Sequence, residues 1–244
     1  MVFAAGLGTR LRPLTNDRPK ALVEVGGKTM LERVITHLAD CGVTDITVNI
    51  HHFGEKIIDF LEEKKNFGLD IHISDERDLL LDTGGGLMKA RKFLDGDEPF
   101  IVHNADILTD LDLKAMYDFH VEHDALSTIL VKDRQTQRYF LFDHDHRLKG
   151  WINKKTGETK PEGYQYDPQK VDSLAFGCVH VLSPRIFDAL EKYSKAKGKV
   201  FSIAPFYAEM CDSYKIYGYQ QFSDYKWLDV GKPETLAQAE EMFK

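Results

Sequence analysis

Short apolar runs alternate with amphipathic stretches through the first half of the chain, and this rhythm limits the possible folds most strongly. The runs that we predict as strands are 1–4, 45–50, 70–74, 100–103 and 126–131. The stretches predicted as helices are 30–38, 55–65, 86–93 and 113–123. Strands that alternate with helices form right-handed βαβ units. We therefore expect an α/β fold whose mostly parallel sheet is flanked by helices.

The helix over 30–38 has the clearest boundaries. Thr29 and Glu32 form a capping-box pattern at its start, and Gly42 follows its end. The first strand, in contrast, begins so abruptly that we expect a few residues to precede Met1 in the natural chain.

Ligands of such sheets bind beyond the carboxyl ends of the strands. This rule selects the loops that follow Phe3, Ile50 and His103. His51 and His52 come directly after one of these strands and could approach a ligand there. We favour the alternative that they are ordinary polar residues at a strand end.

The pattern changes after about residue 137. The segments 139–142, 148–152 and 174–182 are predicted as strands, and the residues 156–168 between them are rich in turn formers. We expect a smaller antiparallel lobe laid on the first part. A helix over 232–243 closes the chain.

Composition excludes several classes of protein. The 244 residues carry a net charge of −7, whereas a nucleic-acid-binding protein needs a basic surface. No apolar run approaches the roughly 18 residues that span a bilayer, and no signal peptide opens the chain, so we expect no membrane contact. Cys41, Cys178 and Cys211 show no disulfide or zinc pattern. We interpret them as buried or idle thiols in the reducing cytoplasm.

The strongest chemical signal is the segment 4–13, AAGLGTRLRP, followed by Arg18-Pro19-Lys20. A strand runs into glycines that let backbone N–H groups approach a phosphate. Arg10, Arg12 and Lys20 add positive charge, which would stabilise a leaving pyrophosphate. The alternative is a plain glycine turn with surface arginines, and the clustering of these cations with the prolines disfavours it.

Two similar motifs are rejected. Gly27-Lys28-Thr29 resembles the end of a P-loop, but Leu22 stands where the P-loop needs its first glycine. The dinucleotide fingerprint needs a third glycine, and this chain has Leu11 there.

Together, Ala4 to Arg10 and Arg18-Pro19-Lys20 resemble the signature of the sugar-1-phosphate nucleotidyltransferases, a family with a Rossmann-like fold. The segment 82–86, DTGGG, resembles the family's second nucleotide loop, which helps to hold the base. The segments 103–106, HNAD, and 227–233, WLDVGKP, resemble the two motifs whose aspartates bind magnesium. These matches span the whole chain.

The resemblance implies a role for each matching residue. The implied nucleotide-binding residues are Ala4, Ala5, Gly6, Gly8, Thr9, Arg10, Thr83, Gly84, Gly85 and Asn104. The implied catalytic residues are Arg10, Lys20, Asp106 and Asp229, and the two aspartates are the implied Mg²⁺ ligands. Two carboxylates that converge on one ion are the expected magnesium arrangement. The plainer alternatives are a helix cap for Asp106 and a turn residue for Asp229.

The chain departs from the family on the sugar side. Ala105 replaces a glycine, and Cys178 stands where the sugar loop usually has glycine, which puts the sugar contacts in doubt. We expect Trp151, Asn153 and Gly177 to approach the sugar, although Trp151 fits the core equally well. The resemblance implies one domain over 1–244, with the nucleotide bound by 1–135 and the sugar by 136–244.

The implied reaction joins a nucleoside triphosphate to a sugar 1-phosphate and releases pyrophosphate. The triple glycine after Thr83 is most similar to the N-acetylmuramate 1-phosphate uridylyltransferases, so UTP is the leading donor. Mannose 1-phosphate guanylyl transfer and choline-phosphate cytidylyl transfer are the alternatives. A nucleotide-binding homologue without turnover is disfavoured because Arg10, Lys20, Asp106 and Asp229 are all present. We expect a monomer or a small homo-oligomer.

Overall fold

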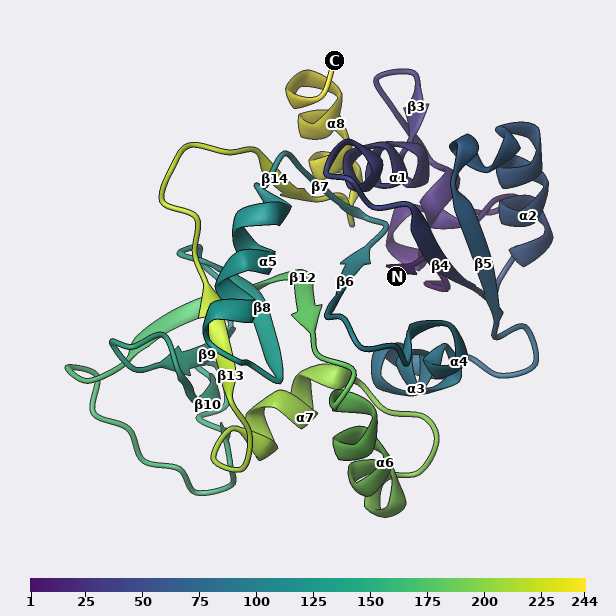
Figure 1. Ribbon diagram of the computed structural model, residues 1–244. Coiled ribbons are helices and arrows are strands. Elements are labelled where there is room, and N and C mark those ends of the chain that lie inside the picture. The colour runs from purple at the N-terminus through teal and green to yellow at the C-terminus, as the bar shows by residue number, and fades with distance from the viewer.

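The computed structural model describes all 244 residues and has a parallel sheet at its centre. Its parallel strands are β1 (Val2–Phe3), β4 (Asp45–Ile50), β5 (Asp70–Asp75) and β6 (Phe100–Asn104), in the order β6-β1-β4-β5. The pairings β1–β4, β1–β6 and β4–β5 are all parallel. The predicted parallel sheet is therefore confirmed (Figure 1).

Helices cover both faces of this sheet. The helices of the first half are α1 (Met30–Asp40), α2 (Gly54–Glu63), α3 (Asp82–Lys89), α4 (Arg91–Leu94) and α5 (Leu113–Glu122). One buried cluster joins α1 and α2 to the sheet, and a second joins α3 and α4 to its other face. In Figure 1, α1 and α2 accordingly lie on the opposite side of the strands from α3 and α4.

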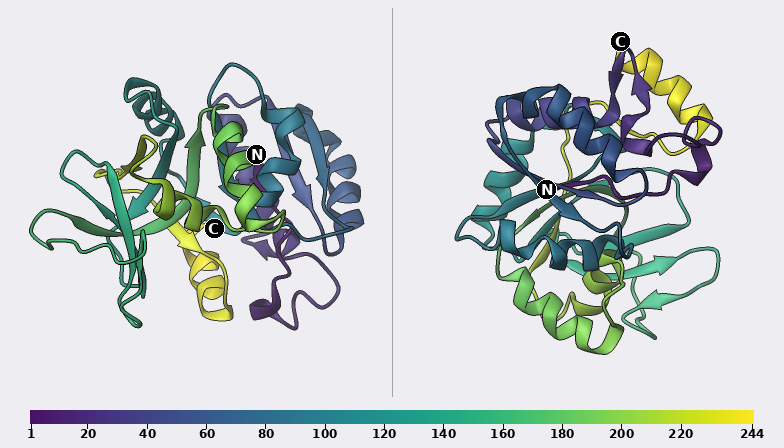
Figure 2. Two further views of the ribbon diagram at one scale, coloured as in Figure 1. Left: turned by 90° about the horizontal axis from the view of Figure 1, so that it is seen from below. Right: turned by 90° about the vertical axis from the view of Figure 1, so that its right-hand side faces the viewer.

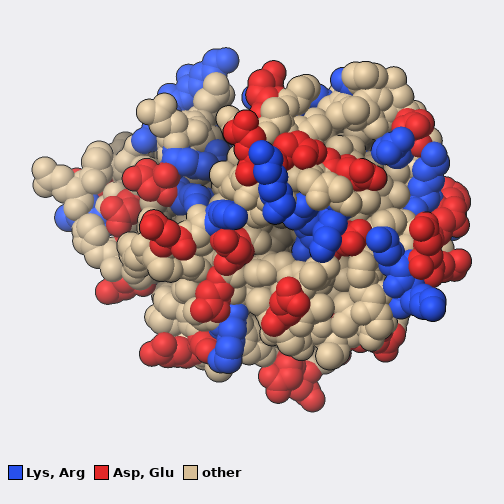
Figure 3. Space-filling view, turned by 90° about the horizontal axis from the view of Figure 1, so that it is seen from above, with Lys and Arg blue, Asp and Glu red and all other residues tan.

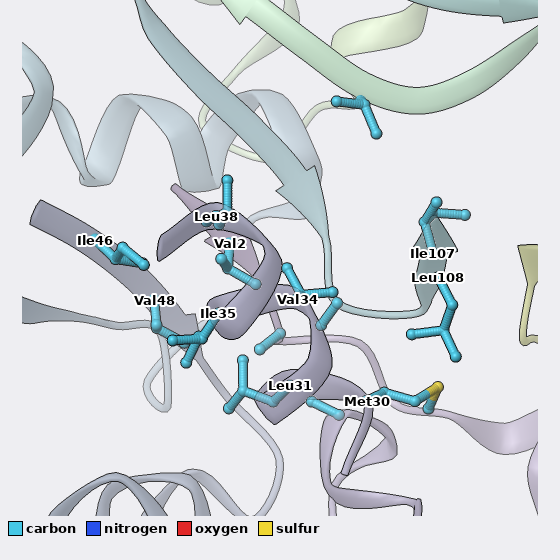
Figure 4. Close-up of a cluster of buried hydrophobic side chains, with 14 of the residues drawn as sticks. Val2, Met30, Leu31, Val34, Ile35, Leu38, Ile46, Val48, Ile107 and Leu108 are labelled. Atoms are coloured by element: carbon cyan, nitrogen blue, oxygen red, sulfur yellow. The ribbon is translucent and has the colours of Figure 1, made fainter. Parts of the chain in front are cut away.

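Helix α1 shows how the sequence pattern becomes packing. Thr29 Oγ1 accepts a hydrogen bond from the backbone N–H of Glu32 at 3.0 Å, which satisfies one free donor of the first turn. The Glu32 carboxylate pairs with Lys64 instead of completing the capping box. The apolar stripe faces Val2, Ile46 and Val48 of the sheet, as Figure 4 shows. The stripe consists of Met30, Leu31, Val34, Ile35 and Leu38.

The antiparallel second part is present, but it continues the central sheet and does not lie on it. The long strand β12 (Asp172–Leu182) pairs with β6 through its last four residues and with β9 (Arg138–Phe142) through its first three. Next to β9 come β10 (Leu148–Asn153) and β11 (Thr159–Lys160). Figure 2 shows these strands projecting to one side of the parallel strands. One strand thus connects the two parts.

Several helices and strands were not predicted from the sequence pattern. They are β2 (Glu24–Val25), β3 (Lys28–Thr29), β7 (Ile107–Thr109), β13 (Ile216–Tyr219), β14 (Trp227–Asp229), α6 (Ile186–Lys197) and α7 (Ile203–Met210). Helices α6 and α7 bury Phe187, Phe206 and Tyr207 against the face that also carries α3. Strand β8 (Ser127–Lys132) and the closing helix α8 (Pro233–Met242) agree with the predicted positions.

One predicted boundary was wrong. The helix expected over 86–93 begins at Asp82 and is divided at Ala90 into α3 and α4. The glycines of 84–86 therefore form the first turns of a helix, not a loop. None of the helices has the length and the apolar character required to traverse a lipid bilayer. On the face seen in Figure 3, acidic and basic side chains are interspersed.

Candidate active site

A cleft of about 360 Å³ opens beyond the carboxyl ends of β1, β5 and β6. Of the residues predicted to bind nucleotide or phosphate, those lining the cleft are Ala4, Ala5, Gly6, Lys20, Thr83, Asn104 and Asp106. The loops after Phe3 and His103 thus reach the cleft as expected. The loop after Ile50 does not, and the segment after β5 takes its place, with Glu76, Leu80 and Asp82 among its contributions.

The glycine segment turns sharply at Gly8, which has a positive φ of 63°. A Cβ atom at Gly8 would lie 2.9 Å from Lys20 Cβ, so only glycine lets the loop pass this close to the lysine. The Gly8 carbonyl accepts a hydrogen bond from Thr15 Oγ1 at 2.9 Å. Thr9 and Arg10 then start a 3₁₀ turn that ends at Leu11. These contacts hold the loop in its present conformation.

Two buried polar residues that the sequence analysis missed hold this loop from below. Asn49 Oδ1 accepts hydrogen bonds from the backbone N–H groups of Ala4 at 2.7 Å and Ala5 at 3.3 Å. Asn49 Nδ2 donates to Glu76 Oε1 at 2.7 Å, and Glu76 Oε2 accepts from the N–H of Leu81 at 3.1 Å. Burial raises the pKa of the Glu76 carboxyl, and the Asn49 hydrogen bond opposes this shift. A polar residue in the apolar strand DITVNI was the available signal.

The hydrogen-bonded pair of Asn49 and Glu76, here called the brace, also explains why the third residue after Thr83 in the DTGGG segment is glycine. A Cβ atom at Gly86 would lie 2.6 Å from Glu76 Oε1 and 3.2 Å from Asn49 Nδ2. The side chain of Glu76 is fully buried at this place. Glycine at 86 therefore allows α3 to pack directly on the Asn49–Glu76 pair, which connects both predicted nucleotide segments.

Gly84 and Gly85 have a packing role in the same helix. Their N–H groups both donate to the Phe201 carbonyl, at 2.9 Å and 3.2 Å. A Cβ atom at Gly84 would lie 2.3 Å from the Phe201 ring, and one at Gly85 would lie 2.2 Å from the Lys199 carbonyl oxygen. Thr83 lines the cleft, while its hydroxyl accepts from the N–H of Ile203 at 3.0 Å. The structure thus places Thr83 at the cleft and both glycines beneath it.

The two predicted metal ligands come together through an antiparallel strand pair. Strand β7 begins directly after Asp106, and β14 ends at Asp229, whose pairing partner is Ile107. The N–H of Val230 donates to the Asp106 carbonyl at 2.9 Å. Residues 123 positions apart in the sequence are therefore neighbours at one edge of the cleft. Neither β7 nor β14 was predicted, so this pairing could not be foreseen.

Cations surround the two carboxylates. The Lys20 ammonium forms an ion pair with Asp106 Oδ2, and this lysine side chain is only 10% exposed. Arg10 and Asp229 both adjoin Gly231, because a Cβ atom there would lie 2.8 Å from Arg10 Nη2 and 2.9 Å from Asp229 Oδ1. Glycine at 231 keeps this approach open. The predicted residues Arg10, Lys20, Asp106 and Asp229 thus form one cluster.

Asp229 is held in an environment that penalises its charge. Burial raises the pKa of its carboxyl, and the Asp106 carboxylate raises it further. The positive charges of Lys20, Arg10 and Arg134 act in the opposite direction. Asp229 Oδ1 is buried and has no hydrogen-bond partner. A buried carboxylate oxygen without a partner beside a second carboxylate fits a hard divalent cation such as Mg²⁺.

The predicted sugar-side residues are spread over the second part of the chain. Trp151 packs against the core cluster of α6 and α7, and Asn153 Oδ1 accepts from the N–H of Lys155 within a turn. The Gly177 carbonyl accepts from Trp227 Nε1 at 3.0 Å. Cys178 has a positive φ of 58°, a backbone conformation typical of the glycine that its position suggests.

Other candidates lie outside this cluster. His51 Nδ1 is 2.7 Å from the Glu76 carbonyl oxygen, and the His52 ring contacts the Phe53 ring at a tilt of 44°. Asp45, Asp70 and His72 approach one another closely enough to share a cation. Asp45 and Asp70 begin β4 and β5, so this group lies at the opposite end of the strands from the cleft.

The fold and the cleft define an α/β protein that presents a glycine-rich loop and paired carboxylates at the carboxyl edge of its sheet. The model of the nucleotidyl transferase family matches residues 1–244. The chain therefore belongs to the nucleotidyl transferase family.

Three comparisons describe its neighbours in this family. The mannose-1-phosphate guanyltransferase of Candida albicans is 31% identical over 240 residues, which are 97% of this chain and 62% of that protein. The chain thus spans less than two thirds of the curated guanyltransferases it matches. The N-acetylmuramate alpha-1-phosphate uridylyltransferase of Neisseria meningitidis is 30% identical over 98% of this chain and 96% of its own length. HddC from Yersinia pseudotuberculosis, solved with GMP-PN, superposes with a TM-score of 0.76 at 26% identity, covering 100% of this chain and 98% of HddC.

Proposed function

We propose that this chain transfers a nucleotidyl group from a nucleoside triphosphate to a sugar 1-phosphate and releases pyrophosphate. The observation that carries the proposal is the cluster of Arg10, Lys20, Asp106 and Asp229 at the edge of a cleft lined by the glycine loop. A cleft that combines free backbone N–H groups, fixed cations and a carboxylate pair suits a triphosphate better than any uncharged ligand.

Each group has a distinct task in this reaction. The glycine loop around Gly6 holds the phosphates of the triphosphate, and Lys20 and Arg10 stabilise the charge that develops on the leaving pyrophosphate. Asp106 and Asp229 would hold Mg²⁺. When bound, this ion would neutralise the phosphate oxygens and so lower the barrier to attack.

The transfer proceeds by direct attack of the sugar phosphate on the α-phosphorus. A covalent nucleotidyl-enzyme needs a free nucleophile at the site. Lys20 is engaged in an ion pair with Asp106, and both aspartates serve the metal. A single in-line displacement inverts the configuration at phosphorus, so retention with a chirally labelled α-thiotriphosphate would contradict this route.

The leading substrates are UTP and N-acetylmuramate 1-phosphate or a related hexose 1-phosphate. The similarity to the Neisseria uridylyltransferase extends over nearly the whole length of both proteins. The alternative is GTP with mannose 1-phosphate, which the guanyltransferase relatives favour. The GMP-PN bound to HddC supports a guanine nucleotide as the donor. In either case we propose that residues 1–135 hold the nucleotide and 136–244 the sugar.

A pyrophosphate-release screen tests the function. The common nucleoside triphosphates are combined with a panel of sugar 1-phosphates and Mg²⁺. We expect one pair to turn over at least tenfold faster than the others, and turnover to be lost in Asp106→Asn and Asp229→Asn. Asp118→Asn, which removes an exposed carboxylate on α5, is the matched control.

Metal binding supplies a second readout that needs no turnover. Mn²⁺ binding, followed by electron paramagnetic resonance, should weaken in both active-site variants and stay unchanged in Asp118→Asn. Equal Mn²⁺ affinity in all four proteins, or activity of Asp229→Asn within a few-fold of wild type, would contradict the assigned metal site.

A further inference from the structure

We propose that Lys132 and Arg134 bind the phosphate of the acceptor, on an aromatic ledge formed by Tyr225 and Trp227. The inference rests on the proposed function and adds to it the residues that would receive the sugar 1-phosphate.

The two cations rest on aromatic rings and not on carboxylates. Lys132 Nζ lies 4.0 Å from the centre of the Tyr225 ring and 5.5 Å from that of Trp227. Arg134 Cζ lies 5.1 Å from the centre of the Trp227 ring. Neither side chain has a carboxylate oxygen within 4.0 Å. A ring face orients a cation without neutralising its charge, so both remain available to an anion.

Backbone carbonyls of β12 hold the ledge in place. The ladder between β12 and β8 is interrupted between Phe176 and His180, which frees carbonyl groups for side chains. Trp227 Nε1 donates to the Gly177 carbonyl at 3.0 Å, and Arg134 Nη2 donates to the Phe176 carbonyl at 3.3 Å. Arg134 Nε is buried and has no hydrogen-bond partner.

Strand β14 carries residues of both the ledge and the proposed metal site. Side chains two residues apart on a strand point to the same face. Trp227 and Asp229 are so related, and Arg134 stacks on the first of them. The Lys132–Arg134 pair lies at the end of β8, the last strand of the part proposed to hold the nucleotide, and it approaches the carboxylates from there. Arg10 approaches from the glycine loop, and Lys20 from the short turn that follows this loop.

This division of charge matches a reaction between two phosphorylated substrates. Lys20 lines the nucleotide cleft, and Lys132 and Arg134 do not. Both reacting phosphates are anions, and their mutual repulsion must be offset before one attacks the other. A separate pair of cations for the acceptor does this without competing for the triphosphate.

Kinetics of the pair identified in the screen form the first test. In Lys132→Gln and Arg134→Gln we expect KM for the sugar phosphate to rise about tenfold or more, the usual cost of losing a charged hydrogen bond. KM for the nucleotide should stay within about twofold. Arg134→Lys should recover part of the loss. The control is Lys226→Gln, because Lys226 lies directly before β14 and its ammonium contacts the Phe243 ring and the Met242 carbonyl.

Binding of inorganic phosphate, followed by ³¹P NMR without metal, is independent of turnover. We expect binding that persists in Lys20→Gln and disappears when Lys132→Gln and Arg134→Gln are added. Thermal unfolding of each variant reports whether it folds. Loss of phosphate binding in folded protein supports the ledge even if no pair in the screen is turned over. A rise in the nucleotide KM alone, or a lower melting temperature with unchanged phosphate binding, would overturn the assignment.

Discussion

Replacement of Gly85 by alanine tests whether this glycine of α3 serves nucleotide binding or helix packing. The sequence resemblance assigns Gly85 to nucleotide binding, whereas the structure places its Cα against the segment 199–201. The added methyl group would lie 2.2 Å from the Lys199 carbonyl oxygen and 3.0 Å from Leu81 Cβ. A backbone carbonyl cannot rotate away as a side chain can, so α3 and this segment must separate.

The expected destabilisation follows from the hydrogen bonds and the packing around Gly85. Separation weakens the hydrogen bonds from the N–H groups of Gly84 and Gly85 to Phe201, which are 2.9 Å and 3.2 Å long. These two bonds contribute about 2 kcal/mol together, and overpacking adds about 1–3 kcal/mol. Alanine returns about 1 kcal/mol through its higher helix propensity. The net destabilisation is about 2–4 kcal/mol, or roughly 5–15 °C in melting temperature for a chain of this size.

Thermal and urea unfolding measure this change. Gly96→Ala is the matched control, because a Cβ atom at Gly96 meets nothing within 4 Å. We expect the control to unfold within about 0.5 kcal/mol of wild type. If Gly85→Ala were equally close to wild type while its nucleotide KM rose, the glycine would serve the ligand and the packing argument would be refuted.

Three further predictions concern buried polar groups. Asn49→Ala should fold, with its free energy of unfolding lowered by about 2–4 kcal/mol and its KM for the nucleotide raised, because two loop N–H groups and Glu76 lose their hydrogen-bond partner. An unchanged KM would show that the loop keeps its conformation without Asn49. Burial, together with the nearby Asp106 and Asp229 carboxylates, raises the pKa of Cys178 to about 12. At pH 8, Ellman's reagent should therefore label the exposed Cys41 and leave Cys178 unlabelled until the protein unfolds. Fast labelling of native Cys41→Ser protein would contradict this prediction. Burial lowers the pKa of three histidines to about 4, 4 and 3, namely His103, His120 and His180. Their unfolded pKa is higher, so stability is full above pH 6.5 and should fall by up to about 4 kcal/mol per unit as the pH drops from 6 to 5; urea unfolding with no such slope would refute it.

The order of the longer strands and helices in the first half followed from the sequence alone. Local signals fix these elements: a hydroxyl cap at Thr29, apolar spacing along α1 and short, mostly apolar runs for β4 and β6. The glycine segment and its cations could be recognised equally well, because they follow one another closely in the sequence. Parallel pairing then placed the loops after β1 and β6 at one edge.

Contacts between distant segments were decided only by the tertiary structure. The strands β7 and β14 have three residues each, too few for a periodic pattern, yet their pairing brings Asp106 and Asp229 together. The sequence pattern places Gly84 and Gly85 in a loop, because no sequence signal indicates that Phe201 is their neighbour in the fold. Two other features also depend on contacts between distant segments. They are the brace of Asn49 and Glu76 and the aromatic ledge under Arg134. Their partners are chosen by packing across the sheet, and sequence periodicity carries no information about such partners.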